Sequence, residues 1–197
     1  MEKWQSKINL VSQSTIKEAF QRHFVDSAQL YPLIPTTTKT LLDLGSGAGF
    51  PALVLAILNQ TSGQGDVTGD SADAAGQGAG TPFWSVTAVE SDQRKCIFMD
   101  EVARQCKIRI TIENQRIERV KPRPVDVITA RALADLTTLL NYSLPFIHAH
   151  TRLLFLKGQG AENEIKEALK KYDFSYRLFQ SQTDEKGQII QIEQLKG

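Results

Sequence analysis

The sequence predicts an α/β fold: a mostly parallel sheet covered by helices on both faces, with an antiparallel hairpin at its C-terminal end. Three observations support this. Short apolar segments alternate with helical patterns along most of the chain. A glycine-rich turn at 45–49 follows the first apolar segment. The 197 residues are 41% hydrophobic and 23% charged, which suits one domain with a sizeable core.

Strand and helix signals follow one another in chain order. Short apolar runs predict strands, and longer stretches of helical periodicity predict the helices between them. Pro51 suits the first turn of a helix, where its missing N–H costs nothing, and Asp92 suits an N-cap. We expect strands at 40–44, 85–89, 108–113, 125–129 and 152–156, and helices at 51–58, 92–106, 134–148 and 162–171.

The two ends of the chain depart from this alternation. Two β-type segments, 176–180 and 189–195, flank the turn Asp184–Gly187 and predict the hairpin. Residues 1–39 look helical and predict a cap on the core of a single domain spanning 1–197.

A low-complexity segment interrupts the pattern at 60–82. It is rich in Gly, Ser, Asp and Ala and has almost nothing to bury, so it cannot offset the entropy of ordering itself. We expect a flexible insertion on the surface without a function of its own.

The composition excludes several classes of protein. Cys96 and Cys106 have no partner at metal-ligand spacing, which argues against a zinc site and against a disulfide scaffold. No apolar run reaches the roughly 20 residues that span a bilayer, and the charged start is unlike a signal peptide. We expect a cytoplasmic protein with no metal and no membrane contact. The net charge of +1 does not by itself indicate a nucleic-acid partner.

The glycine turn is the strongest local motif. Asp43 precedes Gly45, Gly47 and Gly49, and Phe50 follows them. Glycines let a ligand approach the backbone closely at the carboxyl end of a strand, where open α/β sheets bind ligands. A dinucleotide fingerprint requires glycine at the sixth place of the turn, which Phe50 occupies. The turn is similar to the first motif of class I (Rossmann-like) S-adenosylmethionine-dependent methyltransferases; a turn without a ligand stays open as the alternative.

The spacing of one acid supports a nucleoside cofactor. Glu90 ends the second predicted strand, where a carboxylate can accept hydrogen bonds from a ribose diol. It lies 45 positions after Gly45, but only 22 once the insertion at 60–82 is left out. That value is close to the usual spacing of about 20.

Six segments then carry a family resemblance over nearly the whole chain. The sequence resembles the RsmG (GidB) family of bacterial 16S (small-subunit) ribosomal RNA methyltransferases, which modify N7 of a guanine. Departures are the long insertion, a short N-terminal helical segment and Ala52, where the family usually has glycine. The matching segments are WQSKINL (4–10), RHFVDS (22–27), DLGSGAGFP (43–51), VES (89–91) with Arg94 and Lys95, TARA (129–132) and LKG (156–158).

The resemblance implies a cofactor, a partner and a set of contacts. The cofactor is S-adenosyl-L-methionine, and the partner is 16S ribosomal RNA or the small-subunit particle. The sequence does not fix the oligomeric state, and a monomer is the simplest expectation. Cofactor contacts are implied at Gly45, Phe50, Ile117, Glu118 and Arg131. Ile117 and Glu118 follow the third predicted strand, where an apolar side chain and an acid can flank an adenine; a turn residue and a surface acid are the alternative.

The chemistry needs few catalytic groups. Guanine N7 has a lone pair and no proton to lose, so catalysis rests on positioning and the chain needs no general base. Enzymes that methylate exocyclic amines commonly carry an Asn/Asp-Pro-Pro-aromatic motif where this chain has TARA at 129–132. Arg131 is the first candidate to orient guanine O6 and N7, with Lys157 as the second.

Basic residues predict contacts with RNA phosphates. The candidates are Arg22, His23, Arg116, Arg119, Lys121 and Arg123. A solvated basic face is the alternative for this cluster, and a packed helix residue is the alternative for His23. Two other functions stay open: a small-molecule methyltransferase on the same fold, and a nucleotide-binding regulatory protein without catalysis.

Overall fold

The computed structural model describes residues 2–5, 8–12, 16, 18–62 and 84–196. The predicted insertion at 60–82 lies outside the described residues from position 63 onward. Its first residues are placed differently from the prediction, because positions 60–62 form the last turn of helix α3 (Ala52–Ser62). Gln60 Nε2 donates to Lys107 O over 3.0 Å in that turn.

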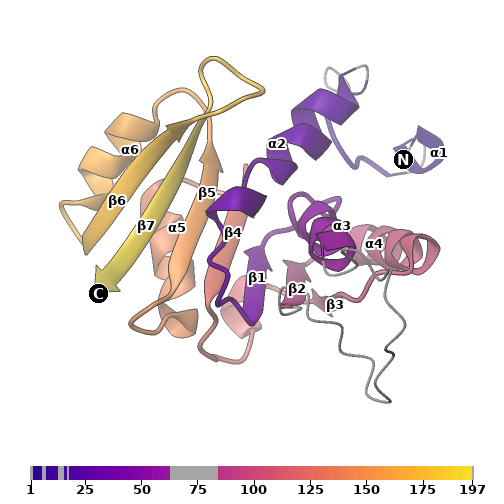
Figure 1. Cartoon of the computed structure of the whole chain (residues 1–197), viewed down its shortest axis with the longest axis horizontal. Coiled ribbons are helices and arrows are strands. Elements are labelled where there is room, and N and C mark those ends of the chain that lie inside the picture. Colours follow the sequence, from indigo (N-terminus) through magenta and orange to yellow (C-terminus); the bar gives the residue numbers. More distant parts are fainter. Residues whose placement is uncertain (1, 6–7, 13–15, 17, 63–83, 197) are drawn as a thin grey trace, which may run out of the picture.

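A single seven-stranded sheet organises the described residues (Figure 1). Its order is β3-β2-β1-β4-β5-β7-β6; the first five strands in this order run parallel, and β7 is antiparallel to both β5 and β6. The predicted mixed sheet with a C-terminal hairpin is therefore confirmed. The strands are β1 (Thr40–Leu44), β2 (Ser85–Glu90), β3 (Thr111–Asn114), β4 (Val127–Arg131), β5 (Arg152–Lys157), β6 (Asp173–Gln180) and β7 (Gln188–Lys196).

Helices cover both faces of this sheet. Neighbouring strand residues point to opposite faces, so Leu42 and Leu44 pack with α5 (Leu136–Ser143) and α6 (Ala161–Ala168). Leu41 packs on the other face with α3 and α4 (Gln93–Cys106). Figure 1 shows α3 and α4 together beside β1 and β2, away from α5 and α6. Burial on both faces explains why the central strands read as continuous apolar runs.

Residues near the ends of two helices determine where these helices begin and end. Asp92 caps α4 as predicted, with its side chain accepting from Arg94 N over 2.9 Å. The helix predicted at 134–148 is shorter, since α5 ends at Ser143 and a 3-10 turn, η5 (Leu144–Phe146), follows. Pro145 explains this difference, because proline has no N–H with which to continue the hydrogen bonds of the α-helix.

Three strand predictions are wrong by two or more residues at their edges. The first strand of the hairpin, β6, begins at Asp173 rather than 176. β3 begins at Thr111 rather than 108, and β4 runs two residues later than predicted. Val125 instead donates its N–H to Phe146 O over 2.8 Å. The Asp126 carboxylate accepts from Lys39 N and Thr40 N at 2.8 and 2.9 Å, outside the ladder. These contacts tie the start of β4 to neighbouring loops.

The N-terminal segment is only partly helical, unlike the predicted cap over 1–39. Its elements are α1 (Glu2–Gln5), the π-helix η2 (Phe20–Val25), α2 (Asp26–Ala28) and the 3-10 turn η3 (Tyr31–Leu33). Residues 8–12 are irregular, and they pack through Ile8, Leu10 and Val11 against Phe50 and neighbouring side chains of α3 and α4. Burial of these apolar residues holds the segment over the core.

Hydrogen bonds also join this segment to the turn between β6 and β7. Gln29 Nε2 donates to Ser181 Oγ over 3.2 Å, and Gln182 N donates to Gln29 Oε1 over 2.9 Å. Thr183 Oγ1 donates to Asp26 Oδ1 over 2.9 Å. The N-terminal segment and the hairpin turn thus meet above the sheet. None of the helices in the described part of the chain has the length and apolar character of a membrane span.

Candidate functional site

A cavity of about 710 Å³ lies at the carboxyl ends of the parallel strands. The turn after β1 lines it with Gly45 and Gly47, and Glu90 and Arg131 line it from the ends of β2 and β4. Residues 115–118 after β3 and 156–158 at β5 complete its floor. This is the edge at which open α/β sheets bind ligands.

The glycine turn has a backbone conformation that residues with a side chain rarely adopt. Gly45 and Gly47 have φ angles of 65° and 57°, in the left-handed region. A Cβ at position 45 would lie 2.6 Å from Leu133 Cδ1, whereas at position 47 it would meet nothing closer than Gly45 O at 4.0 Å. The turn therefore needs glycine for its conformation and leaves the space above Gly47 open. Gly49 does not line the cavity and packs against Leu53.

Asp43 lies beneath the turn and does not line the cavity. It is fully buried, and Thr129 Oγ1 donates to its Oδ1 over 2.7 Å. Its Oδ2 has no hydrogen-bond partner among the described residues. Burial raises the pKa of the Asp43 carboxyl to about 6, against the opposing effect of the nearby Ser46 and Thr129 hydroxyl groups. This geometry assigns Asp43 to the support of the turn.

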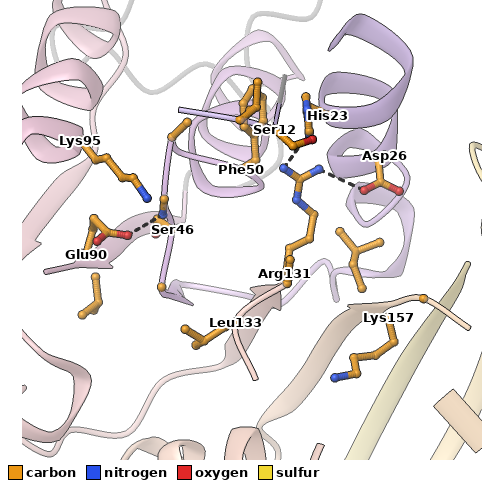
Figure 2. A pocket seen from close by; sticks show the side chains of 18 of the residues that line it. Ser12, His23, Asp26, Ser46, Phe50, Glu90, Lys95, Arg131, Leu133 and Lys157 are labelled. Atoms are coloured by element: carbon orange, nitrogen blue, oxygen red, sulfur yellow. Dashed lines mark hydrogen bonds and ion pairs between the residues drawn. The ribbon is translucent and has the colours of Figure 1, made fainter. Parts of the chain in front are cut away.

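Glu90 reaches the cavity with both carboxylate oxygens already oriented. Oε2 accepts from Gly47 N and Oε1 accepts from Asp92 N, each over 2.8 Å. Figure 2 shows the carboxylate beside the glycine turn, at the wall opposite Arg131. A carboxylate oxygen can accept more than one hydrogen bond, so both oxygens keep the capacity to bind hydroxyl groups.

Arg131 is held by the N-terminal segment. Its Nη1 donates to Arg22 O over 3.0 Å and pairs with Asp26 Oδ2 over 3.2 Å, and its Nη2 lies 2.9 Å from His23 Nδ1. The guanidinium carbon lies 5.2 Å from the Phe50 ring centroid (Figure 2). Within the described part of the chain, the Nε–H and one Nη2–H of Arg131 have no hydrogen-bond partner. Its position is thus fixed while donor capacity remains.

His23 is the acceptor in this cluster. Burial, and then the charge of Arg131, lower the pKa of the imidazole to about 4, so the ring is neutral at pH 7. A neutral ring leaves Nδ1 able to accept from Arg131 Nη2. The ring also stacks on Phe50, with centroids 5.3 Å apart.

Lys157 lines the cavity, but its ammonium group is bound to protein. Nζ donates to Ala134 O over 2.7 Å and pairs with Glu164 Oε2 over 2.6 Å. The same Glu164 oxygen accepts from Leu136 N over 2.7 Å. In Figure 2 the ammonium is directed away from the Arg131 guanidinium. Lys157 thereby ties β5 to the start of α5 and to α6.

Ile117 and Glu118 both line the cavity, as parts of the 3-10 turn η4 (Ile117–Arg119). Ile117 is half-buried against the core. The pKa of the Glu118 carboxyl is lowered by its own backbone N–H and by the Tyr142 hydroxyl. An apolar side chain and a carboxylate thus stand side by side on one wall.

The structure divides the predicted basic cluster. Arg22, His23 and Arg116 line the cavity, whereas Arg119, Lys121 and Arg123 do not. Arg22 pairs with Asp184 over 3.1 Å, and Arg123 pairs with Glu113 over 2.6 Å.

Several lining residues were missed by sequence reasoning. They are Leu10, Val11, Ser12, Asp26, Lys95, Tyr142, Ser181, Thr183 and Asp184, among others. Asp26 and Lys95 fall within or beside the segments that carried the family resemblance, so a signal for them existed. The hairpin-turn residues had none, since they join the site only through contacts across more than 150 positions.

No three His, Cys, Asp or Glu side chains within the described ranges group as a metal site.

The sequence matches one protein family over most of its length. The family model "rRNA small subunit methyltransferase G" matches residues 1–63 and 79–191. Ribosomal RNA small subunit methyltransferase G of Rhodospirillum rubrum is 43% identical over 192 residues, covering 98% of this chain and 84% of that protein. Its counterpart in Paramagnetospirillum magneticum is 41% identical, covering 98% and 83%.

A solved structure shares the fold at low identity. Aeropyrum pernix fibrillarin, in complex with natively bound S-adenosyl-L-methionine, matches with a TM-score of 0.59 and 16% identity, covering 87% of this chain and 75% of that one. The family model matches most of the sequence, and two relatives are more than 40% identical to it. The sheet order is consistent with the same family. The chain belongs to the rRNA small subunit methyltransferase G family.

Proposed function

We propose that this protein transfers a methyl group from S-adenosylmethionine to N7 of a guanine in 16S ribosomal RNA. The observation that carries the proposal is the cavity at the strand ends, where Gly47 and Glu90 meet in a member of this family. A substrate in the small ribosomal subunit implies that the enzyme acts in the cytoplasm, and we propose that it acts as a monomer.

The residues present suit the cofactor. A volume of about 710 Å³ is within the range of small-molecule sites. Glu90 is oriented by two backbone N–H groups and can accept from both ribose hydroxyls. Ile117 offers an apolar surface for the adenine ring, and Glu118 an acceptor for its amino group. The open space above Gly47 lets the ligand approach the turn closely.

The protein's contribution to the chemistry is positioning. S-adenosylmethionine supplies a methyl group on a positively charged sulfur, which leaves as a neutral thioether when the N7–carbon bond forms. Because N7 attacks with a lone pair and loses no proton, no residue of the cavity has to act as a base. The lowered pKa of His23 makes its ring a weak base, and the Lys157 ammonium is bound to protein, so neither side chain is suited to take up a proton.

Arg131 is the residue that we assign to the guanine. Its remaining Nε–H and Nη2–H can donate to O6 of the entering base, which orients the ring and leaves the N7 lone pair free to attack the methyl group. Asp26 pairs with the other side of the guanidinium and offsets its charge beside a base that becomes cationic. The catalytic role of Lys157 stays a prediction, and its contacts favour a structural one.

Methyl transfer from labelled S-adenosylmethionine tests the proposal. The acceptors are unmethylated small-subunit particles, RNA extracted from them, and a no-RNA control with small-molecule extract. We expect label in RNA from wild type, and a loss of roughly 100-fold or more in Arg131→Ala, with Arg177→Ala on β6 as a matched control outside the cavity. Label only in small molecules would favour the small-molecule methyltransferase. Cofactor binding without any transfer would favour the regulatory protein.

A further inference from the structure

Two phenylalanine rings stand exposed on η2. The side chains of Phe20 and Phe24 are 73% and 36% exposed, and Phe20 is the most exposed large hydrophobic residue within the described ranges. The two residues are four positions apart, on one face of the helix. Their rings are stacked, with centroids 5.9 Å apart and an interplanar angle of 19°. Exposure of paired aromatic rings on one face of a helix indicates a binding surface.

This ring pair continues directly into the wall of the cavity. The edge of Phe24 packs on Phe50, with centroids 5.1 Å apart and an interplanar angle of 80°. Phe50 lines the cavity and carries His23 and Arg131 on its ring. Aromatic rings therefore run without a break from the solvent to the side chain that we assign to the guanine.

Positive charge accompanies these rings. Arg22 lies between the two phenylalanines in sequence, lines the cavity, and keeps a half-exposed side chain although it pairs with Asp184. Arg116 also lines the cavity. Exposed aromatic rings beside basic side chains are the features by which proteins bind single-stranded nucleic acid, because every base has a π-face and every phosphate a negative charge.

The reaction itself creates a need for such a surface. A guanine that enters a cavity at the strand ends has to leave its stack, and its neighbour loses a stacking partner. Phe20 does not line the cavity, but its ring is linked to the cavity wall through Phe24 and Phe50, so it can replace that partner. The binding free energy gained there helps to offset the cost of unstacking the target base.

We propose that Phe20, supported by Phe24, stacks the unpaired nucleobase next to the target guanine. The rings form a second RNA-binding subsite, sequence-tolerant and distinct from the guanine contacts of Arg131. This inference rests on the proposed function, since it takes the RNA substrate from it.

Substitutions at position 20 test the subsite. Phe20 is exposed, so its replacement does not open a cavity in the core. For Phe20→Ala we expect KM for unmethylated small-subunit particles to rise roughly 5- to 150-fold, from the usual worth of one stacked base. Phe20→Leu, which keeps apolar area but no π-face, should show most of that loss, and Phe20→Trp should restore wild-type KM. Kd for S-adenosylmethionine should stay unchanged in all three.

Tyr176→Ala is the matched control, because Tyr176 is an exposed aromatic residue (44%) on β6 that does not line the cavity. An independent readout is a short single-stranded RNA with one 2-aminopurine, whose fluorescence wild type should quench and Phe20→Ala should not. Equal KM in wild type and Phe20→Ala would overturn the subsite, as would wild-type KM in Phe20→Leu. A Phe20-dependent dimer in sedimentation would overturn it in favour of a contact between copies. Methylation by neither wild type nor variants, with quenching retained, would refute the proposed function and leave the stacking surface supported.

Discussion

Replacing Glu90 by glutamine tests the cofactor site at its most defined contact. In the structure each carboxylate oxygen of Glu90 accepts one backbone N–H, from Gly47 and from Asp92, at 2.8 Å. Glutamine keeps one acceptor oxygen and places an NH2 group where the other stood. The substitution therefore removes one of the two acceptors that we assign to the ribose diol, together with the negative charge.

The expected loss follows from the contacts involved. A hydrogen bond to a charged acceptor is worth about 1.5–3 kcal/mol, so Kd for S-adenosylmethionine should rise roughly 10- to 150-fold in Glu90→Gln. One backbone N–H beside the turn also loses its acceptor, which should lower the free energy of unfolding by about 0.5–1.5 kcal/mol. Isothermal titration calorimetry measures the first quantity, and urea unfolding measures the second.

Glu101→Gln is the matched control, since Glu101 pairs with Arg104 on the outer surface of α4 and does not line the cavity. It should bind the cofactor within about twofold of wild type. If Glu90→Gln lost the expected stability but kept the cofactor affinity of wild type, Glu90 would only brace the glycine turn, and its assignment to the ribose would be refuted.

Three further predictions concern buried polar groups. Burial raises the pKa of Asp43 to about 6, so the folded state holds this proton more tightly than the unfolded state. Between about pH 4 and pH 7 this group should lower the free energy of unfolding of wild type by roughly 3 kcal/mol. In urea unfolding, the free energy of unfolding of Asp43→Asn should therefore rise relative to that of wild type over the same range. The same pH dependence in both proteins would contradict this. Burial and Arg131 lower the pKa of His23 to about 4 from 6.5, so this group adds stability as pH rises through that interval and loses it on acidification. An NMR titration of His23 should show its midpoint near the lower value, and a midpoint at 6.5 would mean that Nδ1 does not accept from Arg131. Lys157→Met leaves Glu164 without its cation and should lower the free energy of unfolding by about 1–3 kcal/mol; wild-type stability with lost activity would instead support the catalytic role.

The sequence was informative where local chemistry decides the structure. The strand at Thr40–Leu44, the glycine turn after it and the N-cap at Asp92 each follow from residues within a few positions. The position of Glu90 could be predicted as well, because the end of a parallel strand next to β1 has to reach the same sheet edge.

The remainder depends on contacts between distant parts of the chain. Nothing near Arg131 shows that three residues of the N-terminal segment hold its guanidinium, or that Lys157 is bound by Glu164. The hairpin turn reaches the cavity only because Thr183 and Asp184 contact the same N-terminal segment. Residues 8–12 lack helical structure because they pack as an irregular apolar strip, a tertiary effect that overrides local propensity.

The position of the transferred methyl group tests whether the enzyme methylates N7 of a guanine in 16S ribosomal RNA. Unmethylated small-subunit particles would be incubated with the enzyme and S-adenosylmethionine, and their RNA treated with a reagent that cleaves at N7-methylguanine. We predict enzyme-dependent cleavage at a single guanine of 16S ribosomal RNA, absent with Arg131→Ala. Label that enters the RNA without creating a cleavable guanine would contradict the assignment to N7.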